Sequence, residues 1–239
     1  MDTIEYKNHL IVIGQDSDYE SPREWDNLGT MYCSHQRYNL GDVQISGGMG
    51  GFLWKVLCEE NTLISSDEKI DFLYYNKKYI TKEESEKYID ILCKNFIVLP
   101  LFLYDHSGIS MSTSNNGYPF NDYFDSGQVG YIIVSKDKIR QEFKWKNLTK
   151  KRISKILEYL RNEVQIYDDY LTGNVYYYQI MDTPEDYEEG DDLDSETNLD
   201  FISSCSGFYG DIKTSGLLEQ AKSEIDYHIE HEESKENGN

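Results

Sequence analysis

The chain has 239 residues, 38% of them hydrophobic, and a formal net charge of −21. A chain of this length can form a hydrophobic core that needs neither disulfides nor a metal to hold it together. No apolar run approaches the roughly 20 residues of a membrane-spanning helix, and residues 1–8 lack the pattern of a secretion signal. We therefore expect a cytoplasmic protein with no membrane partner.

The negative charge is concentrated toward the C-terminus. Residues 182–239 contain 18 acidic and three basic residues, whereas residues 1–181 contain 26 acidic and 20 basic ones. Half of those 20 bases fall within residues 136–161. This distribution predicts a basic helical stretch followed by an acidic region.

Neither a metal nor a cofactor is predicted by the motifs. Four cysteines (Cys33, Cys58, Cys93 and Cys205) show no C-x-x-C spacing, which argues against a zinc knuckle or a disulfide framework. The glycine-rich run at 47–51 resembles a phosphate-binding loop, but no Lys-Ser or Lys-Thr pair follows it. We interpret it as a flexible turn that leads into a strand over residues 52–58.

Residues 1–134 predict three further strands and one helix. Residues 9–13 form an apolar run of strand length, and an irregular loop follows over residues 21–42. A capping box formed by Thr81 and Glu84 predicts a helix over residues 82–95. Residues 96–104 predict a strand in which Pro100 requires an edge position or a bulge, and residues 128–134 predict a central strand.

Residues 149–239 predict a long helix, one strand, an acidic region and a C-terminal segment. Apolar residues at spacings of three and four predict a helix from the Thr149 cap to Gly173, and residues 174–181 predict a strand. Residues 182–200 contain ten acids and no base, which favours a mobile loop. Residues 201–239 predict a return segment and a polar C-terminal helix with a frayed end.

These elements predict an α+β fold with a mixed or antiparallel sheet and packed helices. We expect one compact core over residues 1–181, then the acidic loop at 182–200, then the return segment and acidic helix. Because the last segment is polar, truncation after Ser215 is expected to leave a folded domain.

One cluster of side chains is typical of a catalytic site. Asp105 and His106 follow one predicted strand, and Asp125 precedes another. If the two strands are neighbours, His106 acts as a general base beside two carboxylates, with Ser107 or Ser126 as a hydroxyl to be activated. Alternatively, these residues serve the chemistry of the turns at the strand ends.

Other polar residues could belong to this site or form a separate pocket. His35, added to the same groups, supplies a further ligand for a divalent metal. Arg23, Asn27 and Arg37 in the loop at 21–42 either line a pocket or satisfy the backbone of an ordered coil.

Several segments of the chain, taken together, resemble segments of one protein family. They are PREWDNLGTM at 22–31, LPLFLYDHSGI at 99–109, DSGQVG at 125–130, YLTGNVY at 170–176 and SCSGFYG at 204–210. Together they resemble an uncharacterised family of accessory proteins carried by bacteriophages and conjugative elements. The resemblance implies an accessory gene product of a mobile element, and it implies no reaction and no catalytic residues.

The leading hypothesis is a stoichiometric binder or inhibitor of a host protein that has a basic nucleic-acid-binding surface, as in counter-defence against restriction or CRISPR systems. Carboxylates can stand in for phosphates, and the partner-binding candidates are acids of the predicted loop: Glu188, Glu189, Asp191, Asp192 and Asp194. One alternative is a small enzyme centred on His106, Asp105 and Asp125. Another is a nucleic-acid binder that uses the basic stretch at 136–161.

Overall fold

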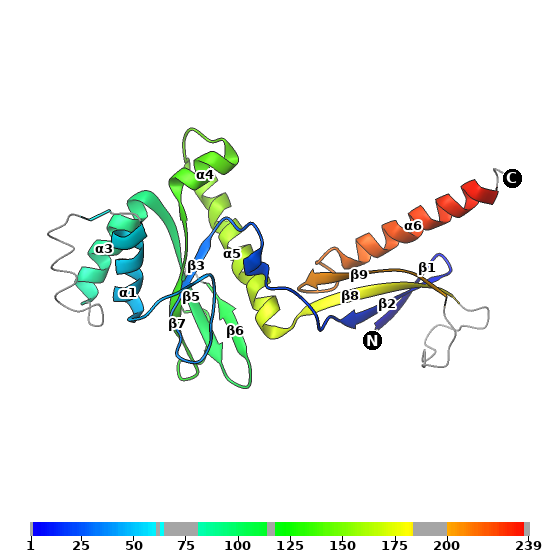
Figure 1. Cartoon of the computed structure of the whole chain (residues 1–239), viewed down its shortest axis with the longest axis horizontal. Helices are drawn as coiled ribbons and strands as arrows, with labels where there is room; N and C mark the ends of the chain where they lie inside the picture. Colours follow the sequence, from blue (N-terminus) through cyan, green and yellow to red (C-terminus); the bar gives the residue numbers. More distant parts are fainter. Residues whose placement is uncertain (1, 61–62, 65–80, 114–117, 184–199, 237–239) are drawn as a thin grey trace. The chain divides into compact units, whose positions relative to one another are not determined.

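The computed structural model describes residues 2–60, 63–64, 81–113, 118–183 and 200–236. Its contacts divide the chain into unit 1 (Met1–Ser21 and Asp169–Asn239) and unit 2 (Pro22–Asp168) (Figure 1). Helices and sheets occur in both units, which confirms the α+β class. The division differs from the expected single core over residues 1–181, because the strands at the two ends of that range share a sheet with the C-terminal segment.

Unit 1 is built on a four-stranded antiparallel sheet in the order β1-β2-β8-β9. Strands β1 (Asp2–Tyr6) and β2 (His9–Gln15) form a hairpin, of which only β2 was predicted. Strand β8 (Val175–Asp182), predicted from its apolar alternation, pairs with β2 from Gln15 to His9. Strand β9 (Phe201–Tyr209), which corresponds to the predicted return segment, completes the sheet beside β8.

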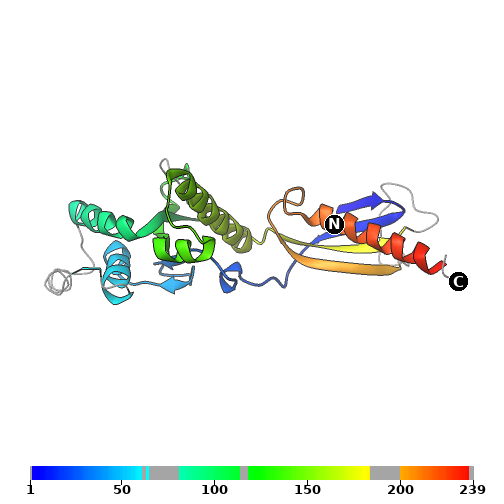
Figure 2. The same ribbon diagram turned by 90° about the horizontal axis from the view of Figure 1, so that it is seen from above.

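The C-terminal helix α6 (Leu217–Glu236) lies along one face of this sheet (Figure 2). Leu217, Ala221 and Ile225 are fully buried at successive spacings of four, so they form one apolar stripe on the helix. They pack against strand residues that include Ile11 and Tyr178. The helix is therefore part of the core of unit 1, and the expectation that the fold is independent of residues after Ser215 does not fit this packing.

Unit 2 contains a five-stranded sheet in the order β4-β3-β7-β5-β6. Its strands are β3 (Thr30–Cys33), β4 (Val43–Gln44), β5 (Phe96–Asp105), β6 (Ile109–Ser112) and β7 (Ser126–Ser135). The pairing is antiparallel except between β3 and β4. Strand β7 is the central strand, as its β-branched residues predicted.

Unit 2 also contains helices, some of which cover the two faces of this sheet. They are η1 (Pro22–Glu24), α1 (Gly48–Trp54), the π-helical η2 (Lys55–Glu60), α3 (Lys82–Asn95), α4 (Lys136–Phe143) and α5 (Lys150–Thr172). Tyr131 and Ile133 of β7 pack with α1, η2 and α3, whereas Ile132 and Leu160 of α5 both lie close to Gly29. Because successive strand residues point to opposite faces, α5 covers the other face.

Two local predictions have opposite outcomes. The capping box is present, since Thr81 Oγ1 accepts from Glu84 N at 3.2 Å and Thr81 N donates to Glu84 Oε2 at 2.9 Å. The strand predicted over residues 52–58 is wrong, because this segment is helical. Its fully buried residues, Phe52, Leu53, Val56 and Leu57, repeat at a spacing of four, which places them on one helical face instead of alternating across a sheet.

Pro100 has the environment that its sequence context predicted. It lies opposite Tyr131 of β7, and the β5–β7 register shifts between Leu101 and Phe102. Within the described residues, β6 pairs with β5 from Phe102 to Asp105, so none of the described ladder pairs requires a backbone donor from Pro100 on that side.

The predicted acidic loop at 182–200 coincides mainly with residues 184–199, which lie outside the described residues. The same holds for the partner-binding candidates Glu188, Glu189, Asp191, Asp192 and Asp194.

Candidate ligand-binding site

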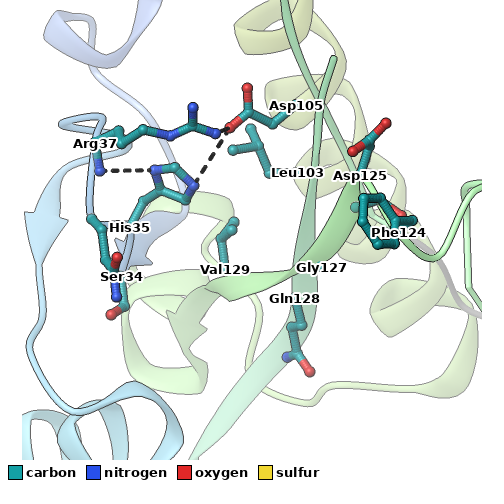
Figure 3. A pocket seen from close by; sticks show the side chains of 12 residues that line it. Ser34, His35, Arg37, Leu103, Asp105, Phe124, Asp125, Gly127, Gln128 and Val129 are labelled. Atoms are coloured by element: carbon teal, nitrogen blue, oxygen red, sulfur yellow. Dashed lines mark hydrogen bonds and ion pairs between the residues drawn. The ribbon is translucent and has the colours of Figure 1, made fainter.

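A cavity of unit 2 opens where β3 leaves its neighbour β7. The strands pair from Thr30 to Cys33, and Ser34 N donates to Val129 O at 2.7 Å. The chain then turns away, which leaves a cavity of about 550 Å³ between this turn and the start of β7 (Figure 3). His35 and Arg37 lie on one side of it, and Asp105, Asp125 and Gln128 lie on the other.

Asp105 holds the turn in place. Its carboxylate accepts a hydrogen bond from Arg37 Nη2 and another from Tyr38 Oη at 3.2 Å. His35 Nε2 lies 3.9 Å from the same carboxylate, and the His35 ring stacks on Tyr38 with centroids 5.0 Å apart. Asp105 is thus occupied by groups of the turn, and it positions the Arg37 guanidinium at the rim of the cavity.

Arg37 remains available to a ligand. Its side chain is 67% exposed even though it is paired with Asp105. A guanidinium has five N–H donors, so donors remain for a carboxylate or a phosphate.

His106 and Asp125 are in contact, as the hypothesis of neighbouring strand ends required for one of its two carboxylates. Asp105 N donates to Asp125 O at 2.8 Å, which shows that the two strand ends are neighbours. His106 Nδ1 lies 2.7 Å from Asp125 Oδ2, and the side chains are 61% and 26% exposed. With Nδ1 directed at the carboxylate, Nε2 is the nitrogen that can accept a proton from a substrate or water. Asp105 does not join this pair.

The two candidate nucleophiles have other contacts. Ser126 Oγ accepts from Tyr118 Oη at 2.8 Å and donates to the Asp122 carbonyl. Ser107 lies in the turn after β5 with φ of 57°. Among the described residues, no group of three or more His, Cys, Asp and Glu side chains is placed to hold a metal ion.

The loop residues Arg23 and Asn27 stabilise unit 2 and do not line the cavity. Arg23 Nε and Nη2 donate to Asp42 at 2.9 and 2.6 Å, and Nη1 donates to Glu163 at 3.2 Å. Burial by itself lowers the pKa of Arg23, but hydrogen bonds and charges from Asp42 and Glu163 outweigh it and raise that pKa above its usual value. Asn27 Nδ2 donates to Pro22 O at 2.8 Å. Only Arg37, of the three loop candidates, borders the cavity.

Part of the basic stretch at 136–161 has structural contacts. Lys136 Nζ donates to the carbonyls of Cys93 and Lys94 at 2.7 and 3.0 Å, at the end of α3. Lys138 Nζ donates to Asn27 O at 2.8 Å. These lysines cap a helix and secure a loop, which reduces the cationic surface that a nucleic acid would contact.

A smaller apolar cavity of about 180 Å³ shares Ser34, Gln128 and Val129 with the polar one. Met49, Phe52 and Tyr131 also line it. The sequence did not predict this cavity, because it depends on α1 being a helix.

Comparison of the chain with protein-family models, curated proteins and solved structures gives no match. Within the described part of the chain, no helix combines the length and apolarity needed to cross a bilayer.

Proposed function

We propose that the protein is a cytoplasmic accessory protein of a mobile element that binds and inhibits a host factor through unit 1. The division of charge supports this proposal. Unit 1 contains 24 acidic and four basic residues, a net −20, whereas unit 2 contains 20 acidic and 19 basic residues, a net −1. Almost all of the chain's net charge of −21 is thus carried by unit 1.

The described part of unit 1 indicates how this charge is displayed. Some carboxylates have internal partners, such as Asp226 with Lys7 at 2.8 Å and Glu224 with Tyr178 Oη at 2.6 Å. Glu219, Glu230 and Glu232 on α6 are exposed. A surface of exposed carboxylates attracts a basic protein surface and competes there with phosphates. We therefore propose a partner that itself binds nucleic acid, such as a restriction or CRISPR component.

The test is a charge-neutralised variant with a matched control. The variant changes Glu188, Glu189, Asp191, Asp192 and Asp194 to Gln or Asn. The control makes the same change at five exposed acids of unit 2: Glu24, Asp26, Asp90, Glu142 and Glu158. Both variants change the net charge equally. Association with a partner captured from host lysate is measured by surface plasmon resonance at several salt concentrations, with duplex DNA as competitor.

We expect the first variant to associate about tenfold or more slowly and to lose part of the salt dependence, because long-range attraction between charges sets the association rate. The control is expected to associate at close to the parental rate, and DNA is expected to displace the parent. Equal effects of the two variants would contradict the assignment to unit 1. New DNA binding by the first variant would favour the alternative in which the acids shield the basic stretch at 136–161.

A second candidate function is catalysis at His106. The contact of His106 with Asp125 at the edge of a cavity favours it, because an oriented imidazole is a competent general base. The test is turnover of generic ester and phosphodiester substrates by the parent, the His106→Ala variant and a His228→Ala control on α6. If His106 is catalytic, the His106→Ala variant loses turnover while the parent and the His228→Ala control keep it. Equal turnover by all three proteins would exclude catalysis at His106.

A further inference from the structure

Strand β7 has an open edge inside the cavity of unit 2. On one side, residues 126–128 pair with Tyr104, Leu103 and Phe102 of β5. On the other side, the pairing with β3 ends at Gly130, followed by the single bond from Ser34 to Val129. Within the described ranges, residues 126–128 therefore have no strand neighbour on the β3 side.

The backbone groups of this edge are directed toward the opening. Asp105 N donates to Asp125 O, so Asp105 and Asp125 are a hydrogen-bonded pair of the antiparallel ladder. Because such pairs alternate, the N–H and C=O of Ser126 and of Gln128 point away from β5. Main-chain donors and acceptors at an open strand edge are matched by an extended peptide backbone.

The ends of the opening differ in chemistry. Arg37 presents unused guanidinium donors at the polar end. At the other end, the apolar cavity of about 180 Å³ is lined by Met49, Phe52 and Tyr131, and it shares Gln128 and Val129 with the polar cavity. An apolar side chain fits a cavity of this kind, whereas a free phosphate uses neither it nor the strand edge.

We propose that this opening binds an extended segment of a partner protein. The segment adds its backbone to the edge at Ser126–Gln128, places a carboxylate on Arg37 and inserts an apolar side chain beside Met49 and Phe52. Alternate side chains of an extended peptide point in the same direction, so an acidic and an apolar residue near each other in sequence recognise the two ends. This inference concerns unit 2 alone, and it is independent of the acidic surface of unit 1.

The experiment begins with a displayed library of random decapeptides panned against the full chain. We expect the selected peptides to combine Asp or Glu with a large aliphatic or aromatic residue. Selection of basic peptides only, or of none, would overturn the proposal, because basic peptides are what unit 1 attracts.

Selected peptides are then synthesised with a fluorescent label, and their binding is measured by fluorescence anisotropy. Arg37→Gln is expected to weaken binding about tenfold or more, the usual consequence of losing a charge-assisted hydrogen bond. It should also abolish the preference for Glu over Gln in the peptide. Arg140→Gln is the matched control, because Arg140 is an exposed arginine whose partner among the described residues is Asp137, in the same helix α4.

Backbone pairing is tested separately with peptides that carry N-methyl groups on alternate amides. One of the two alternating patterns is expected to abolish binding and the other to preserve it, because only every second amide faces the β7 edge. Equal binding of both N-methylated peptides, or equal binding by the parent and Arg37→Gln, would show that the peptide does not occupy this opening. Circular dichroism establishes that the variants are folded.

Discussion

The two units differ in net charge and in whether charged side chains take part in their cores. Unit 1 carries a net −20, and its described core is an apolar layer between one sheet face and α6. Unit 2 carries a net −1, and it contains a buried ion-pair network in which Arg23 joins Asp42 and Glu163. Most described acids of unit 1 are on the surface, with the buried Asp169 and the Tyr178-bonded Glu224 as exceptions, whereas unit 2 uses the Arg23 network to hold its fold together. A change in charge is expected to alter binding in unit 1 and stability in unit 2.

Removal of α6 is expected to have the largest effect. Truncation after Ser215 removes Leu217, Ala221 and Ile225, all fully buried against the sheet of unit 1. The loss is on the order of 5 kcal/mol or more, comparable to the whole stability of many domains. We expect amides of β2 and β8 to lose protection from hydrogen exchange, while those of β5 and β7 keep it. Protected β8 amides in the truncated chain would show that the sheet persists without its helix.

Substitution of Arg23 tests the network in unit 2. Arg23→Met leaves the carboxylates of Asp42 and Glu163 without their cation in a site where the Arg23 side chain is 6% exposed. Loss of one partner from a buried ion pair costs about 3–5 kcal/mol of unfolding free energy. The control Arg140→Met removes an exposed pair and is expected to cost about 0.5 kcal/mol or less. Chemical denaturation measures both, and similar costs for the two variants would contradict a stabilising network.

Cys33 is expected to make the stability of unit 2 fall at alkaline pH. Burial, with a contribution from Asp42, raises the pKa of the Cys33 thiol to about 12. The folded chain therefore keeps this proton at pH values where the unfolded chain has lost it, so stability is complete below pH 9 and decreases between about pH 9 and 12. Between pH 8 and pH 10 we expect the parent to lose about 1 kcal/mol more than Cys33→Ala. Parallel pH profiles of the two proteins would show that the thiol does not contribute.

Substitution of His106 is expected to have the smallest effect on stability. The side chain is 61% exposed, and its contact with Asp125 is an exposed pair. His106→Ala is expected to change the unfolding free energy by about 0.5 kcal/mol or less. A larger decrease in thermal denaturation experiments would mean that His106 mainly fixes the strand ends, which would weaken the catalytic candidate.

The sequence predicted the helix ends that are set by residues close together in the chain. The capping box at Thr81 gave the start of α3, and Gly173, with φ of 70°, follows the end of α5 as the apolar periodicity indicated. The run at residues 52–58 was misassigned because seven mostly apolar residues fit both a buried strand and a buried helix. Strand β3 was missed because Thr30–Cys33 is short and lies in a segment without periodicity.

The candidate site was predictable only where it followed from two adjacent strand ends. The contact of His106 with Asp125 was predicted on the condition that the strands are neighbours, and they are. The pairing of Asp105 with Arg37 was not predicted, because it depends on the turn after β3 reaching a strand end nearly 70 positions later in the chain. Sequence spacing carries no information about such a contact, which is set by sheet order.

The order of strands in unit 1 has a consequence for synthesis on the ribosome. Strand β2 pairs with β8, so His9 has no strand partner until Asp182 has been synthesised, and Ile11 cannot pack against α6 until that helix has been made. Unit 2 is a continuous segment placed between these partners. A nascent chain can therefore fold unit 2 while the β1-β2 hairpin still has an apolar face without its neighbours. Unit 1 is therefore completed only after α6 has been synthesised, and until then the apolar residues of β2 lack the partners that bury them in the folded protein.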